Sequence, residues 1–363
     1  MRILFVGYLG RGQTSGMRCE GLRRLGHEIE AVDAGSVWRG ASYLARQIGQ
    51  ATLRSARIDE FNAEVIRAAV RLRPTLVWAE KQEYLQPSTV EQLKKLGASV
   101  LHYNPDPYFS LSWKQTRFAD ECLKLYDVLV VTKRYELAAY RDHCRGRVIY
   151  SPLGYDPVGH APPRVSLVET RDVAFVGGWE PRRERLLTKA ARTKARVTVW
   201  GYGWAIAQGS RANPFRALRL GRLTPAHRLY LGDRATELSD AIGKGESGNG
   251  EIYENEYAAA IASSGISLGF VREICPDQHT TRTFEIPAIG GFMLADRTEE
   301  HLEFFEEGKE AEFFASEDEY VDKLTYYLLN KGERERIAKA GHERCMHSGY
   351  SYDDRMKEVL SQL

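Results

Sequence analysis

The residues with the clearest capacity for chemistry fall within residues 277–296, a stretch that combines charged, hydroxyl-bearing and helix-breaking residue types. Thr280 and Thr281 belong to the types that cap helices, and Arg282 and Glu285 would follow in the first turn. A helix amino terminus offers N–H groups and partial positive charge, and an arginine fork adds donors that can grip a phosphate. The Glu285 carboxylate can accept hydrogen bonds from sugar hydroxyls. We therefore predict a site for a nucleoside diphosphate.

The end of this stretch predicts where the helix stops. Pro287 is poorly tolerated deep in a helix, so the helix should be short or kinked, and the glycine pair at 290–291 lets the chain turn into an apolar strand at 292–295. Taken alone, Arg282 and Glu285 also fit a surface ion pair worth roughly a few tenths of a kcal/mol. The flanking proline and glycines favour the ligand site over this alternative.

His279 stands directly before the two threonines and is a further candidate for contact with phosphate. A single histidine is more often structural, and both interpretations stay open. The histidines of the chain show no metal-ligand spacing, so we expect neither a metal site nor a cofactor.

The composition bounds the class of protein. A chain of 363 residues suggests two domains, and its formal charge of +2 disfavours nucleic-acid binding. The five cysteines are scattered without a Cys-x-x-Cys pair, which favours a reducing cytoplasm. No apolar run approaches the length of a bilayer span, so we expect any membrane contact to be peripheral.

Strand and helix patterns alternate along both halves of the chain. The first unit is an apolar strand at 3–6, a glycine-rich loop, a helix at 17–25 and a second strand at 27–32. Gly10 and Gly12 in this loop could let the backbone approach the phosphates of a donor, or they serve an ordinary tight connection. Their spacing does not give the Gly-x-Gly-x-x-Gly pattern of dinucleotide binding. The alternation predicts an α/β protein with parallel sheets.

Breaker residues divide the two halves. Six prolines and glycines between 152 and 163 form the densest such stretch, which indicates a linker at 153–168. We therefore expect a domain at 1–152 and a second α/β domain at 169–350. A closing helix at about 351–363 is a candidate for packing back onto the first domain.

The segment 201–250 interrupts the regular pattern and reads as an insertion or a long loop. Its basic residues could bind an anionic acceptor or the headgroup surface of a membrane, or they form a solvated loop. These residues are Arg211, Arg216, Arg219, Arg222 and Arg228.

Asp106 follows a predicted strand at 99–103 within the sequence Asn-Pro-Asp-Pro. This sequence also fits a plain turn formed by aspartate and proline. The alternative is a carboxylate that binds an acceptor or removes its proton, which requires a position within hydrogen-bonding distance of the acceptor hydroxyl.

The order of these features resembles the GT-B glycosyltransferases, whose two Rossmann-like domains face a cleft. Residues 282–296, followed by Glu-Gly-Lys-Glu at 307–310, resemble the carboxyl-terminal block of the CgeB-like and group 1 glycosyltransferases. The sequences at 174–177, 199–201, 25–28 and 103–106 support the resemblance.

The resemblance implies roles for particular residues. Glu285 would accept the ribose hydroxyls, Arg282 and Arg183 would face the diphosphate, and the backbone of Thr280 and Thr281 would cap it. Asp277 occupies the first place of the family's Glu-x7-Glu pattern, with a shorter carboxylate, and this first residue would contact the donor sugar.

The implied activity is metal-independent transfer of a sugar from a nucleotide-sugar donor to a glycan, lipid-linked or small-molecule acceptor. A second interpretation is a sugar-nucleotide epimerase of the same fold. A third is a catalytically silent GT-B module that binds a nucleotide or polysaccharide.

Overall fold

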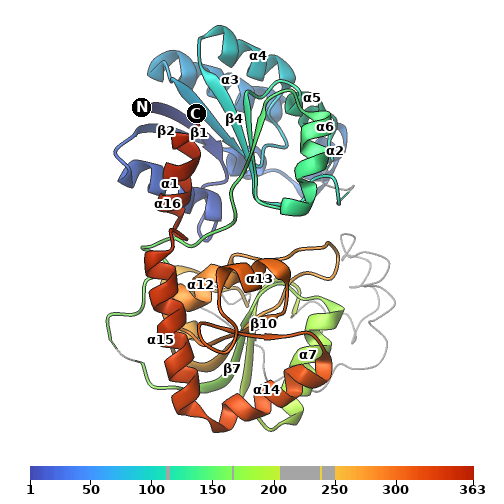
Figure 1. Ribbon diagram of the computed structural model, residues 1–363. Helices are drawn as coiled ribbons and strands as arrows, with labels where there is room; N and C mark the ends of the chain where they lie inside the picture. The colour runs from blue at the N-terminus through green and yellow to red at the C-terminus, as the bar shows by residue number, and fades with distance from the viewer. Residues whose placement is uncertain (112–114, 166, 205–237, 239–249) are drawn as a thin grey trace. The chain divides into compact units, whose positions relative to one another are not determined.

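The computed structural model describes residues 1–111, 115–165, 167–204, 238 and 250–363 (Figure 1). The chain divides into two compact units, one formed by Met1–Leu153 with Tyr352–Leu363 and the other by Gly154–Ser351. The five arginines between 211 and 228 lie outside the described residues, so the hypothesis of an acceptor or membrane contact there stays a prediction.

The amino-terminal unit is built on a parallel sheet of six strands in the order β2-β1-β3-β4-β5-β6. The strands are β1 (Arg2–Gly7), β2 (Glu28–Asp33), β3 (Leu76–Glu80), β4 (Ser99–Asn104), β5 (Val128–Val131) and β6 (Arg147–Tyr150). The helices are α1 (Thr14–Arg24), α2 (Tyr43–Thr52), α3 (Ala56–Leu72), α4 (Pro87–Lys95), α5 (Arg117–Leu123), α6 (Leu137–His143) and α16 (Tyr352–Ser361), with 3-10 turns η1 (Ala34–Trp38) and η3 (Arg134–Glu136).

Both faces of this sheet are buried. Ile3 and Phe5 of β1 pack in the cluster that contains α1 and α16, whereas Leu4 and Val6 pack in the cluster that contains α3, α4 and α5. Successive side chains of a strand point to opposite faces, so an uninterrupted apolar strand requires helices on both sides. This requirement explains why α16, from the far end of the chain, lies with the amino-terminal unit.

A buried ion pair joins the elements of the amino-terminal unit. Arg18 of α1 donates from Nε to both carboxylate oxygens of Glu80, at 3.1 and 3.0 Å, and both side chains are almost fully buried. The guanidinium lies between the rings of Tyr103 and Tyr352, at 4.7 and 4.8 Å from their centroids. The pair therefore connects α1, β3, β4 and α16 through one cation.

The carboxyl-terminal unit contains a parallel sheet of five strands in the order β11-β10-β9-β7-β8. The strands are β7 (Arg171–Val176), β8 (Val197–Trp200), β9 (Ser264–Gly269), β10 (Met293–Asp296) and β11 (Glu312–Phe314). The helices are α7 (Pro181–Arg192), α11 (Glu254–Ala262), α12 (Arg282–Ile289), α13 (Glu299–Phe304), α14 (Glu317–Leu329) and α15 (Lys331–His347). Helices α7 and α14 pack together, as do α12 and α15 (Figure 1).

The α/β class predicted from the sequence is confirmed in both units. The strands at 3–6 and 197–200 and the helix at 317–329 appear within one or two residues of the predicted ends. The short strand β11 and the short helix α5 escaped prediction because three or seven residues carry too little periodicity to be distinguished from loop.

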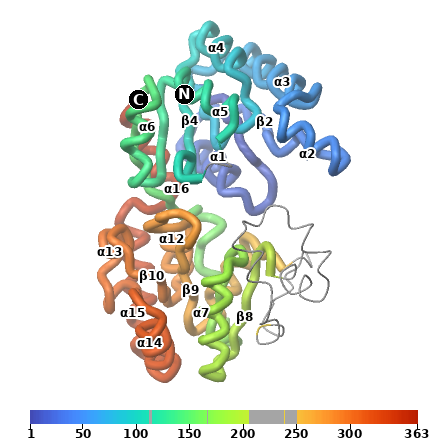
Figure 2. Tube along the Cα trace, turned by 90° about the vertical axis from the view of Figure 1, so that its right-hand side faces the viewer, coloured from blue at the N-terminus to red at the C-terminus, as the bar shows by residue number. Residues whose placement is uncertain are grey.

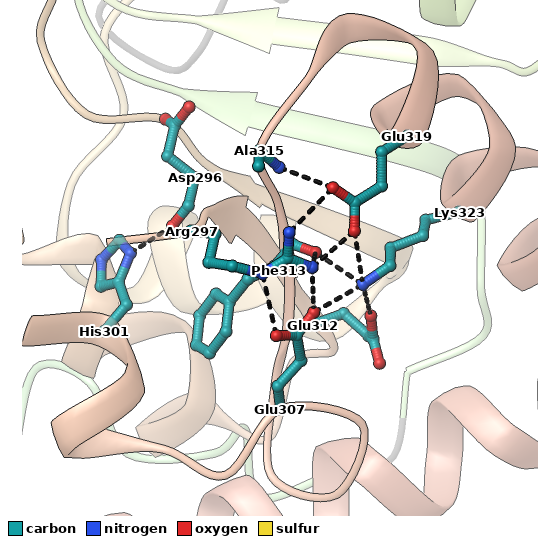
Figure 3. A network of polar contacts seen from close by, with 9 residues as sticks. All are labelled: Asp296, Arg297, His301, Glu307, Glu312, Phe313, Ala315, Glu319 and Lys323. Atoms are coloured by element: carbon teal, nitrogen blue, oxygen red, sulfur yellow. Dashed lines mark hydrogen bonds and ion pairs between the residues drawn. The ribbon is translucent and has the colours of Figure 1, made fainter. Parts of the chain in front are cut away.

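A network of charges ties β10, β11 and α14 together (Figure 3). Arg297 donates to Glu307 and to Glu319, each at 2.9 Å, and Lys323 lies 2.7 Å from both Glu307 and Glu312. Hydrogen bonds from Arg297 lower the pKa of Glu319 from its ordinary value of 4.5 to about 2. The carboxylate of Glu319 therefore stabilises the folded chain more than the unfolded chain.

We predict that Glu319→Gln destabilises the carboxyl-terminal unit and makes its free energy of unfolding depend less on pH in the acid range. The folded pKa lies below the unfolded pKa, so the carboxylate contributes stability above about pH 4.5 that is lost as the pH falls towards about 2. Urea unfolding at a series of pH values measures this contribution as the difference between the two proteins. A constant difference across that range would contradict the prediction, and Glu335→Gln, on an exposed pair with Lys331, is the control.

The buried pair of the amino-terminal unit makes a separate prediction. Glu80→Ala should lower the free energy of unfolding by about 3–5 kcal/mol, because it leaves the Arg18 charge buried without its carboxylate. The double variant Arg18→Leu/Glu80→Leu should lose less, since it removes both charges. Urea denaturation measures both values, with Glu20→Ala on the exposed pair with Arg23 as the control. Equal losses in the single and double variants would show that the charge imbalance is not the cause.

Candidate functional site

The strand order of the carboxyl-terminal sheet reverses at one position, between β7 and β9. β7 is the first strand of the unit, and the chain continues to β8 on one side and later to β9 on the other. Ligands of α/β sheets bind where the strand order reverses in this way, at the carboxyl ends of the strands. The candidate site therefore lies beyond Val176 and Gly269, the last residues of β7 and β9.

Arg183 bridges the loops that follow these two strands. Its Nη1 donates to Gly178 O at 2.9 Å and its Nη2 donates to Phe270 O at 3.4 Å. The side chain is buried, and this burial lowers the pKa of its guanidinium, an effect that the carboxylate of Glu180 opposes. Arg183, which was predicted to face the phosphates, is thus a fixed positive charge at the carboxyl ends of β7 and β9.

Arg282 also lies at the end of β7. It opens α12, and its Nε donates to Val176 O, the last carbonyl of β7, at 3.1 Å. Its Nη1 donates to Thr281 Oγ1 at 2.8 Å, and the side chain keeps about a third of its surface exposed. Arg183 and Arg282 therefore lie near each other, and their contact with a diphosphate stays a prediction.

Glu285 lies one turn further along α12 and has only 4% of its side chain exposed. Arg282 Nη1 lies 3.4 Å from its Oε2, and His160 Nε2 lies 3.6 Å from its Oε1. Strong charge-assisted hydrogen bonds are shorter, at about 2.7–2.9 Å. These two cationic neighbours therefore hold the carboxylate loosely. The buried Tyr257 is a further neighbour, because burial and then the charge of Glu285 raise the pKa of this tyrosine.

His160 was not recognised in the sequence because it falls in the stretch interpreted as a linker. The backbone N–H of Asp156 donates to its Nδ1 at 2.9 Å, so the proton of the neutral ring resides on Nε2, the nitrogen that faces Glu285. Burial lowers the pKa of His160 from its ordinary value of 6.5, and the negative charges of Glu285 and Asp156 oppose this shift. The ring also packs edge-on against Tyr257.

The predicted capping of α12 by threonine side chains is wrong. Thr281 has helical backbone angles and its hydroxyl makes no capping bond, because that oxygen accepts from Arg282 instead. The backbone N–H of Thr280 donates to the hydroxyl of Thr283 at 3.1 Å, and Thr283 in turn contacts His301. The expected shortness of the helix is confirmed: it has eight residues, contains Pro287 and ends at Gly290 with φ of +89°.

Asp277 and His279 are both buried. His279 contacts the Glu300 carboxylate through Nδ1 and packs edge-on against Phe284 and Phe304. This environment fits the structural interpretation of His279, and its contact with phosphate stays a prediction, as does the sugar contact of Asp277.

An ion pair between Arg182 and Asp296, at the carboxyl ends of the strands, was also not predicted from the sequence. Arg182 contacts both carboxylate oxygens of Asp296, which also accepts from the backbone N–H of Val271 at 2.8 Å. The only sequence signal was the position of Arg182 next to Arg183 and of Asp296 at the end of a predicted strand. The pair connects α7, β10 and the segment after β9.

The remaining predicted residues belong to the amino-terminal unit. Asp106 is mostly buried and lies 2.6 Å from Lys81 Nζ. Gly12 has a φ of +73°, which a glycine adopts readily, whereas a side chain at Gly10 would make only an ordinary contact. Only Gly12 is therefore required by the conformation of this loop.

Comparison with known proteins gives a consistent result. Residues 182–361 match the family model described as glycosyl transferase-like. No curated protein sequence gives a significant match.

Solved structures share the fold over the whole chain at low sequence identity. Sucrose-phosphate synthase from Thermosynechococcus elongatus has a TM-score of 0.64 at 13% identity, covering 100% of this chain and 99% of that chain. HepE of Anabaena in complex with UDP-glucose has a TM-score of 0.61 at 12% identity, covering 100% of both chains. Trehalose 6-phosphate synthase from Burkholderia multivorans has a TM-score of 0.58 at 13% identity, covering 99% and 96%.

The two parallel α/β sheets and these similarities define the fold as that of the GT-B glycosyltransferases. The matched residues are just under half of the chain, include most of α7 and all of α12, and are similar to the glycosyl transferase-like family. The resemblance to group 1 glycosyltransferases that the motifs indicated is thereby confirmed.

We predict that His160→Ala lowers the free energy of unfolding by about 1–3 kcal/mol, because the buried Asp156 N–H loses its acceptor. The pKa of folded His160 lies below 6.5, so the neutral ring contributes stability above that pH, and the contribution is lost as the pH falls below it. Subtracting the unfolding free energy of His160→Gln from that of the natural protein should isolate this loss. A difference independent of pH would contradict it, and His143→Gln, on an exposed histidine, is the control.

Proposed function

We propose that this chain transfers a sugar from a nucleoside diphosphate sugar to a hydroxyl acceptor. The observation that carries the proposal is the buried Glu285 carboxylate, which its cationic neighbours hold loosely. It lies with Arg183 and Arg282 at the carboxyl ends of β7 and β9. A carboxylate beside guanidinium groups matches two neighbouring parts of such a donor, because the carboxylate can bind the ribose hydroxyls and the guanidinium groups can bind the diphosphate.

Uridine diphosphate sugars are the donors to test first. HepE of Anabaena, which shares the fold, has been solved with UDP, with UDP and glucose, and with UDP-glucose. In our proposal Glu285 accepts from the ribose hydroxyls, Arg282 and Arg183 face the diphosphate, and the backbone at Thr280 and Thr281 caps it. Asp277 completes the donor side in this proposal, whereas His279, which contacts Glu300 and is fully buried, is the weaker candidate for contact with the phosphates.

The reaction forms a bond between the acceptor oxygen and the anomeric carbon while the bond from that carbon to the diphosphate oxygen breaks. The diphosphate takes the electron pair, and the hydroxyl proton leaves the acceptor. Preorganised guanidinium groups stabilise the negative charge that develops on the diphosphate. We propose that Arg183, Arg282 and the amino terminus of α12 provide this stabilisation without a metal ion.

The amino-terminal unit is proposed to bind the acceptor, which is a glycan, a lipid-linked sugar or a small molecule. Asp106 is the candidate to receive the hydroxyl proton. It forms an ion pair with Lys81 at 2.6 Å, and a general base must lie within hydrogen-bonding distance of the acceptor hydroxyl.

We predict that Glu285→Ala and Arg282→Ala each weaken nucleotide binding by about 10- to 100-fold, as expected for the loss of charge-assisted hydrogen bonds worth about 1.5–3 kcal/mol. Isothermal titration calorimetry with uridine, guanosine, adenosine and thymidine diphosphates measures the affinities and identifies the base.

Arg336→Ala, on an exposed arginine of α15, is the matched control and should bind like the natural protein. Unchanged affinity in both site variants would remove the site assignment. Conversion of the donor in the absence of any acceptor would favour the epimerase instead, and binding without turnover on any acceptor would favour the silent module.

A further inference from the structure

Helix α2 directs its apolar side chains into solvent. Tyr43, Leu44 and Ile48 are 76%, 67% and 54% exposed, and the only buried residue of the helix is Gly49. Amphipathic helices of globular proteins normally place the apolar face against the core. Figure 2 shows α2 at the outer edge of the amino-terminal unit.

The packing of Gly49 explains this reversed orientation. A Cβ at Gly49 would lie 2.1 Å from the ring of Trp38, so the backbone of α2 rests directly on that side chain. Successive helical residues are rotated by about 100°, which places Tyr43, Leu44 and Ile48 within one arc on the side away from Gly49. The helix is thus anchored by its smallest residue and presents its largest ones outward.

The segment that contains α2 is basic. The chain from Ala34 to Ile58 contains four arginines and no acidic residue. These are Arg39, Arg46, Arg54 and Arg57, all of them exposed. Arg39 is paired with Asp33 from outside the segment, at 2.9 Å.

We propose that α2 binds the surface of an anionic lipid bilayer, with Tyr43, Leu44 and Ile48 inserted among the lipids. Interfacial helices combine an apolar arc that enters the headgroup region with basic residues that contact anionic lipids. Tyrosine suits this boundary because its ring is apolar and its hydroxyl is polar, and arginine keeps its charge in the headgroups while its stem lies in the apolar layer. Among the helices of the described parts of the chain, none is long and apolar enough to cross a membrane.

Charge complementarity favours a lipid surface over a second copy of the chain. The segment carries four arginines, of which only Arg39 is paired with an acidic residue in the contacts described above, so two copies of it would repel each other on contact. A bilayer rich in anionic headgroups presents the opposite charge. The proposal does not depend on the donor site, because it concerns a separate surface of the amino-terminal unit.

The test is cosedimentation of the full chain with vesicles of equal parts phosphatidylglycerol and phosphatidylcholine, compared with vesicles of phosphatidylcholine alone. We expect binding to the anionic vesicles that weakens with salt. Arg46→Gln/Arg54→Gln should reduce the partition coefficient by about fivefold for each arginine, and Leu44→Gln/Ile48→Gln should reduce it by about tenfold or more.

Two matched controls remove the same chemistry from other elements. Leu96→Gln/Leu329→Gln replaces two exposed apolar residues, and Arg117→Gln/Lys357→Gln removes two exposed charges. Both should bind vesicles like the natural protein. Unfolding midpoints are measured for every variant, and Leu44→Gln alone replaces the double variant if that variant is destabilised.

Several outcomes would overturn the proposal. They are failure of the natural protein to bind anionic vesicles, equal losses in the α2 variants and the controls, and loss of binding only when Arg211, Arg216 and Arg219 are replaced. Self-association that disappears in Leu44→Gln/Ile48→Gln would assign the surface to a second copy instead. Because no nucleotide is present, these outcomes are independent of whether the donor site is correct.

Discussion

The constraint on which this structure depends is that all strands of a parallel sheet end at the same edge. In the carboxyl-terminal unit this edge gathers Arg183, Arg282 and Glu285 from α7 and α12, which are far apart in sequence. In the amino-terminal unit the corresponding position between β1 and β3 is occupied by the chain itself, because Gln82 donates to Val6 O and Glu80 O. The same topology therefore gives a candidate ligand site in one unit and a packed connection in the other.

The electrostatics of the two edges differ accordingly. Arg18 and Glu80 satisfy each other through a bidentate fork, and their burial stabilises a junction of helices. Glu285 is buried to a similar degree, yet its cationic neighbours stand at 3.4 and 3.6 Å. A buried carboxylate is costly unless it is fully hydrogen-bonded, so loose contacts are retained only where another partner supplies the remaining bonds. Tyr257 is one such neighbour of Glu285, and in our proposal the ribose of the donor is another.

Much of the fold could be predicted because periodicity and breaker residues are local signals. The apolar run of β1 and the periodic pattern at 317–329 indicate where these elements begin and end. Pro287 and Gly290 predict that α12 is short. The site could be predicted only in part. Arg282 and Glu285 are neighbours on one helix, but His160 reaches Glu285 from a segment whose prolines and glycines indicate a linker. Contacts between distant segments leave no mark on local spacing, which is why His160 was missed.

Helix α2 shows how a single contact can reverse a rule of sequence interpretation. Its apolar pattern alone predicts a buried face, but the fit of Gly49 against Trp38 turns that face outward. An apolar arc within a basic segment has a lower free energy at a bilayer surface than in water. If the amino-terminal unit binds the acceptor and also binds the bilayer, a lipid-linked acceptor is favoured among the three acceptor classes. The protein and its lipid-linked acceptor would then be confined to one membrane surface. This confinement raises the effective concentration of the acceptor without any additional contact.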